Sequence, residues 1–175
     1  RLKLFSWLST ISSFLDAFIR DIQSHVRIFK KVLILLSLYY SIVKFSGLGP
    51  AFMDRILRLS EFPSPGGHAV VESMEIFPGG SGANTTSGLS GYGVESAYIS
   101  VVGGDDMGED FVSSMTGADV DCSQIEVSER MPTGIIDCFV DEKGERTFVV
   151  FPNSNEELMK SADHWDFSGI DILHL

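Results

Sequence analysis

Cysteine is scarce in this sequence of 175 residues. Its two cysteines, Cys122 and Cys138, do not form a Cys-x-x-Cys pair, and no histidines cluster near them. The sequence therefore indicates no zinc site, and no metal-binding residue is assigned; Asp105 and Asp106 are expected to cap the following helix, with a metal-holding pair as the alternative. Two cysteines in a chain of this size are typical of buried thiols in a reducing compartment, and a disulfide between them is the open alternative.

Basic residues are also scarce beyond position 44. Residues 45–175 hold 6 Lys and Arg against 22 Asp and Glu, whereas residues 1–44 hold 7 basic residues and 2 Asp. The net charge of −11 argues against nucleic acid as a partner, because phosphate backbones bind cationic surfaces. The contrast in charge predicts two parts, an N-terminal extension over residues 1–40 and a domain over residues 41–175.

No uncharged run is long enough to span a membrane as a helix. The run from Val32 to Val43 has 12 residues, about 18 Å as a helix against a hydrocarbon core of about 30 Å. Residues 1–31 carry apolar side chains at helical spacing, which predicts an amphipathic helix. Three interpretations stay open: a helix packed on the domain, a basic segment for organelle targeting or membrane contact, and mistranslated sequence. We expect a cytoplasmic protein, with organelle targeting as the alternative.

Several common catalytic motifs are missing. There is no Gly-x-x-x-x-Gly-Lys-Ser/Thr run, which excludes a P-loop. The run Gly80-Ser81-Gly82 lacks the third glycine of a dinucleotide fingerprint, since position 85 is Thr. A hydrolase nucleophile elbow is nearly matched around Ser81, but Ala83 stands where the last glycine belongs.

The most informative run is Pro78-Gly79-Gly80-Ser81-Gly82-Ala83-Asn84-Thr85-Thr86. A Gly-Gly turn lets the backbone approach a ligand, because no Cβ stands in the way. The small residues that follow suit the start of a helix, where free N–H groups face a bound polar molecule. Asn84 would lie in the first turn, with its amide able to bond hydroxyl groups.

The pattern along residues 41–175 predicts strands that alternate with helices, and therefore a mostly parallel α/β sheet. Two hairpins, Arg55–Ser60 with Ala69–Phe77 and Gly134–Val140 with Arg146–Phe151, predict a small appended β-lid. The remaining expected strands are Ser41–Gly47, Ala97–Val102 and a core strand at Ile170–Leu175. The expected helices are Ala83–Tyr92, Asp110–Met115 and Glu156–Ala162.

These motifs, in their order and spacing, resemble the N-terminal portion of the ribokinase-like (PfkB) family of sugar and nucleoside kinases. The resemblance runs from about Ser41 to Leu175. The matching segments are Gly47–Asp54, Phe62–Gly66, Gly79–Asn84, Gly103–Gly108, Pro132–Gly134, Gly144–Thr147 and Asn153. It implies that Asp54, at the end of the family's first strand, holds substrate hydroxyls together with Gly79, Gly80 and Asn84.

The sequence departs from the family at three points. Ser81 stands where ribokinases usually have lysine and Phe52 where they have asparagine, so the pattern looks more like the nucleoside-kinase branches. The family's catalytic Gly-Ala-Gly-Asp run does not occur, so no catalytic residue is assigned. The resemblance thus predicts a ribokinase-like fold truncated at the C-terminus, from a kinase about twice as long.

The resemblance implies an ATP-dependent kinase, with Mg²⁺, that phosphorylates a hydroxymethyl group of a sugar or nucleoside. It implies that this chain alone is inactive and that the lid could pair two copies into a homodimer. The alternative hypothesis is a non-catalytic, kinase-derived module that binds a sugar or nucleoside, or another protein. The nucleotide-binding residues are not assigned.

Overall fold

The computed structural model describes residues 30–31 and 43–175. The predicted amphipathic extension over residues 1–40 lies almost wholly outside the described residues, as do Ser41 and Ile42 of the first expected strand. No helix in the described part of the chain is long and apolar enough to cross a membrane.

The central sheet is wholly parallel, as the alternation of strands and helices predicts. β4 (Glu95–Gly103) lies between β1 (Lys44–Leu48) and the short strands β5 (Val120–Asp121) and β6 (Ile125–Ser128). β9 (Ile172–His174) pairs with the other side of β1. The side chains of β4 are buried from Tyr98 onward because both faces of this strand are covered.

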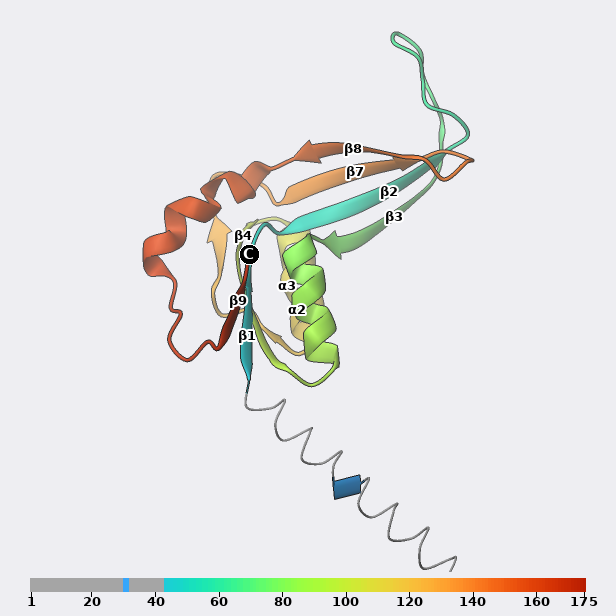
Figure 1. The fold of residues 1–175 in the computed structure, drawn as a ribbon. Coiled ribbons are helices and arrows are strands. Elements are labelled where there is room, and N and C mark those ends of the chain that lie inside the picture. Colours follow the sequence, from blue (N-terminus) through green and yellow to red (C-terminus); the bar gives the residue numbers. More distant parts are fainter. Residues whose placement is uncertain (1–29, 32–42) are drawn as a thin grey trace, which may run out of the picture. The chain divides into compact units, whose positions relative to one another are not determined.

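Helices cover the two faces of the central sheet. α2 (Ser81–Gly91) and α3 (Asp106–Gly117) lie together on one face, and the 3-10 helix η1 (Asn153–His164) lies on the other (Figure 1). The core beneath α2 and α3 is formed by Ala51, Met53, Ala83, Tyr98, Val102, Phe111, Met115 and Val120.

The lid is a second sheet with the strand order β3-β2-β7-β8. Its antiparallel hairpins are β2 (Phe52–Leu59) with β3 (Val71–Gly79) and β7 (Gly134–Val140) with β8 (Arg146–Phe151). The hairpins join through a parallel β2–β7 ladder, and the lid sheet lies across one end of the central sheet (Figure 1). The predicted α/β fold with a β-lid is confirmed.

Several details differ from the expectation. The helix expected at Asp110–Met115 begins earlier, at Asp106, and the one expected at Glu156–Ala162 is a longer 3-10 helix. The strand at the C-terminus is not a core strand: the side chains of Ile172 and Leu173 are exposed because no element covers their sheet edge in the described structure. Cys122 and Cys138 are both free thiols, so the disulfide alternative is wrong.

Candidate functional site

Asp54 lies on the lid and not at the end of the first strand, where we expected it. β1 ends at Leu48, and the segment Gly49–Ala51 crosses from the central sheet into β2. Pro50 lacks the N–H that would continue the parallel ladder, so the strand cannot run through to Asp54. Asp54 therefore stands close to the base of the lid, opposite Phe77 of β3.

The carboxylate of Asp54 is only half-exposed, and it is incompletely satisfied. Its Oδ1 atom is buried and has no hydrogen-bond partner among the described residues. Desolvation by burial raises the pKa of this carboxyl above its ordinary value. A buried acceptor without a donor costs free energy, so Asp54 is an unusual feature of the lid base.

Gly79 and Gly80 complete one wall of this site. A Cβ on Gly79 would overlap the carboxylate of Asp54, so the absence of a side chain allows the acid to lie flat against the β3 backbone. Gly80 has φ of 105°, which favours glycine, and a Cβ there would lie 2.7 Å from the carbonyl oxygen of Pro50. The predicted Gly-Gly turn is therefore required by the close packing of the lid base.

The helix α2 starts directly after this turn. Gly80 is its N-cap residue, and no side chain caps the first-turn N–H groups. Asn84 lies in the first turn, where its N–H donates to the Gly80 carbonyl oxygen at 2.9 Å and its side chain is exposed. The structure thus brings Asp54, Gly79 and Gly80 together and places Asn84 one helical turn away.

Two hydroxyl groups below the site were missed by sequence reasoning. The hydroxyl of Tyr98 donates to the Pro50 carbonyl oxygen at 3.0 Å and also bonds the backbone of Ala83. Ser100 donates to the Gly49 carbonyl oxygen at 2.7 Å. Both side chains are fully buried on β4, so they join the crossing segment and the start of α2 to the core.

The turn Gly103–Gly108 has a structural role through Asp105. Asp105 is the N-cap of α3 and accepts from the Gly108 N–H at 3.0 Å. The same carboxylate accepts from the hydroxyl and the N–H of Thr133 at 2.5 and 3.0 Å. Burial raises the pKa of Asp105, but these hydrogen bonds outweigh it and lower the pKa overall. Asp105 therefore holds Thr133, the residue immediately before β7, to the start of α3.

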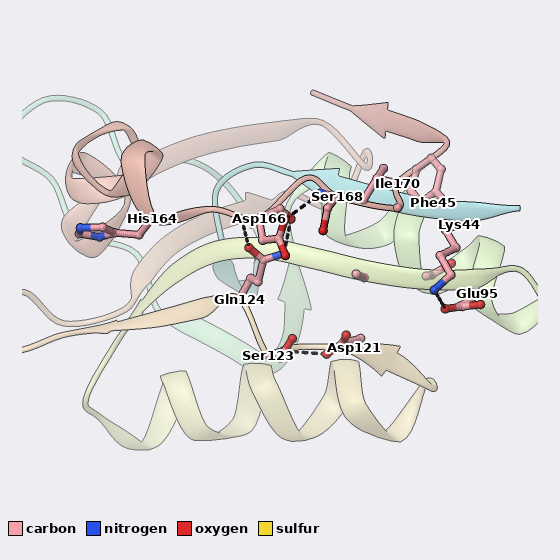
Figure 2. Close-up of a pocket in the computed structure, with 13 residues that line it drawn as sticks. Lys44, Phe45, Glu95, Asp121, Ser123, Gln124, His164, Asp166, Ser168 and Ile170 are labelled. Carbon is pink, nitrogen blue, oxygen red and sulfur yellow. Dashed lines mark hydrogen bonds and ion pairs between the residues drawn. The ribbon is translucent and has the colours of Figure 1, made fainter.

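A cavity of about 450 Å³ lies elsewhere, at the amino ends of β1 and β4 and beside Asp121 of β5 (Figure 2). Its polar lining includes Lys44, Glu95, Gln124 and Asp166, and none of the four candidate substrate residues. Within the described ranges, no three His, Cys, Asp or Glu side chains are grouped to hold a metal ion.

The described fold is thus a parallel α/β sheet with a β-lid, and a partly buried acid lies beside a glycine turn at the lid base. The family model for pfkB family carbohydrate kinases matches residues 46–174, which is more than half of the sequence. The chain belongs to this family.

Individual relatives agree with the family. An ATP-dependent ribose-1-phosphate kinase of Halopiger xanaduensis is 28% identical over 131 residues, which cover 70% of this chain and 44% of that protein. A nucleoside kinase of Methanocaldococcus jannaschii is 27% identical over 131 residues, covering 68% of this chain and 43% of that protein. A ribokinase structure from Thermotoga maritima superimposes with a TM-score of 0.64 at 25% identity, covering 75% and 44% of the two chains. The chain thus spans less than half the length of these relatives.

Proposed function

We propose that this chain is the substrate-binding portion of an ATP-dependent kinase that phosphorylates a hydroxymethyl group of a sugar or nucleoside. The observation that carries the proposal is the buried, unpartnered Oδ1 of Asp54 against the Gly79–Gly80 turn. A carboxylate can accept hydrogen bonds from two neighbouring hydroxyls, and charge-assisted bonds of this kind are the stronger ones. Vicinal hydroxyls are the feature that sugars and nucleosides share.

The neighbouring residues would orient such a ligand. Because Gly79 and Gly80 carry no side chains, Asp54 and Pro50 can pack against them, and this packing would fix the carboxylate that receives the ligand. The start of α2, with no side-chain cap, offers N–H groups to ligand oxygens, and Asn84 adds an amide one turn along. In this proposal the lid residues bind the substrate and exclude water from its reacting hydroxyl.

In this proposal the described residues hold the sugar or nucleoside and not the nucleotide. An unpartnered carboxylate such as Asp54 repels phosphate groups, and the described part of the chain offers no group of metal ligands for Mg²⁺. ATP with Mg²⁺ would supply the transferred phosphate in the intact protein, but we assign no step of that transfer to these residues. We therefore also propose that residues 1–175 alone do not transfer phosphate.

Calorimetric titration of the 175-residue chain with ribose, fructose and adenosine tests the proposal. We expect one of these ligands to bind, and Asp54→Asn to weaken it by about 10- to 100-fold, since a hydrogen bond to a charged group is worth about 1.5–3 kcal/mol. Asp121→Asn, an exposed acid on β5, is the matched control and should bind like the wild type. Equal binding by both variants would reject the assigned site, and phosphate transfer from ATP by this chain would reject its proposed inactivity.

We propose further that the lid pairs with a second copy of this chain. Its two outer strands, β3 and β8, carry apolar side chains that are about half exposed: Met74, Ile76, Phe77, Phe148 and Val150. Exposed apolar surface of this kind is typical of interaction sites. Sedimentation velocity should show a dimer that Ile76→Lys converts to a monomer, and a wild-type monomer at all concentrations would reject the pairing.

A further inference from the structure

The crossing segment Gly49–Ala51, which carries the chain from the central sheet to Asp54, is held by side chains at each of its three carbonyl groups. Ser100 and Tyr98 bond the first two from below, as described above. Asn155 bonds the third: its Nδ2 donates to the Ala51 carbonyl oxygen at 2.8 Å. The Ala51 N–H donates in turn to Asn155 Oδ1 at 2.9 Å, so one side-chain amide satisfies the whole backbone of Ala51.

Asn155 differs from the other two residues because it follows the last strand of the lid in sequence. It lies at the start of η1, just after β8 ends, whereas Ala51 immediately precedes β2. Its two hydrogen bonds therefore tie the exit of the second hairpin to the entrance of the first. Gly134, the first residue of β7, leaves the necessary space, because a Cβ there would overlap Asn155 Nδ2 and lie 2.8 Å from the Ala51 carbonyl oxygen.

The other end of the first hairpin is held by backbone pairing and close packing: Gly79 pairs with Phe52, and Gly80 packs against the Pro50 carbonyl oxygen. Gly79 and Gly80 carry no side chains, and no side chain caps the helix that follows them. The Ala51 end of β2 is instead held by a side-chain amide, so the placement of Asp54 against Gly79 also depends on how firmly Asn155 holds Ala51.

We propose that Asn155 is a positioning residue of the substrate site: its amide fixes Ala51, and through it the angle at which the lid presents Asp54. This role rests on the proposed function only where ligand affinity is concerned. The fixation itself is a property of the lid that can be measured without any ligand.

The chain offers a matched control for this amide. Gln124 makes the same pair of hydrogen bonds to a distant backbone, with Nε2 donating to the Asp166 carbonyl oxygen at 2.9 Å and Oε1 accepting from the Asp166 N–H at 2.6 Å (Figure 2). This pair lines the cavity at the amino ends of β1 and β4, away from the lid. Gln124→Ala therefore removes equivalent bonds without touching Ala51.

The experiment compares amide hydrogen exchange and ligand titration for the wild type, Asn155→Ala, Asn155→Asp and Gln124→Ala in the full 175-residue chain. In Asn155→Ala we expect the Ala51 amide and the amides of β2 and β7 to exchange at least about tenfold faster, since two hydrogen bonds are lost. In Asn155→Asp the Ala51 amide should stay protected, because the carboxylate still accepts, while β2 exchanges faster. Gln124→Ala should change neither strand.

In the titration, Asn155→Ala should bind the sugar or nucleoside about tenfold more weakly, and Gln124→Ala should bind like the wild type. Lid exchange or affinity that changes equally in Asn155→Ala and Gln124→Ala, or in neither, would overturn the proposal. If the wild type binds no ligand, the proposed function fails on this chain. The exchange rates of β2 and β7 then decide the role of Asn155 alone.

Discussion

The close packing at Gly80 can be tested by replacing it with alanine and comparing the result with Gly144→Ala. Both glycines have positive φ, 105° and 81°, but a Cβ on Gly144 meets no atom within 4 Å. Gly144→Ala should therefore cost only the left-handed backbone conformation, about 1–2 kcal/mol. At Gly80 the backbone strain of about 1–3 kcal/mol adds to an overlap with the Pro50 carbonyl oxygen, which costs about 1–3 kcal/mol more.

We therefore expect Gly80→Ala to lose about 4 kcal/mol of unfolding free energy, a large part of the roughly 5–15 kcal/mol that folded domains have. Urea unfolding of the two variants measures the difference, with the slope of the transition as a check on the two-state assumption. A gap of at least about 2 kcal/mol supports the close contact. Equal losses in both variants would refute it, because they would show that Gly80 is required for its φ alone.

Three further predictions concern charged groups. Arg55 holds Asp137 with bonds of 2.5 and 2.8 Å at a largely buried position, so Arg55→Met should lower the unfolding free energy by about 2 kcal/mol in urea titrations, and an unchanged midpoint would contradict this. Hydrogen bonds lower the pKa of Asp105 in the folded chain despite its burial. Its carboxylate therefore adds to the unfolding free energy above the ordinary Asp pKa of about 4, and this contribution is lost as pH falls through the folded pKa. Asp105→Asn should flatten the acid limb of a curve of unfolding free energy against pH. The pKa of Asp54 is raised by desolvation, so its ionisation lowers stability as pH rises, and Asp54→Asn should melt higher than wild type at pH 7 even though it binds ligand more weakly.

Local patterns in the sequence predicted most of the fold. The second hairpin was placed at its observed bounds, because Asp141 to Gly144 forms a recognisable turn and both flanking strands are rich in apolar and β-branched residues. The start of α3 was placed four residues late. Gly108 lowers the helical signal there, and the reason for that glycine is tertiary: a Cβ would meet the Gly103 backbone and Thr133.

The candidate site was predicted only in part. Gly79 and Gly80 carry a strong local signal, and the structure places Gly79 against Asp54 and Gly80 against Pro50; their role in binding a substrate stays a prediction. The prediction that Asp54 ends the first strand was wrong, because the crossing at Pro50 depends on partners distant in sequence. Tyr98 and Asn155 are 48 and 104 residues away from the backbone groups they bond. No local pattern reports contacts of that separation, and an isolated Tyr or Asn carries no motif.

The central claim is that the Asp54 carboxylate receives the hydroxyls of a sugar or nucleoside. The most direct test is a titration of the Asp54 carboxyl carbon by NMR, with and without the ligand found by calorimetry. We expect the pKa of Asp54 to lie above the ordinary value in the free chain and to fall when the ligand is added, because hydroxyl donors stabilise the charged form. An ordinary pKa that no sugar or nucleoside changes would contradict the account.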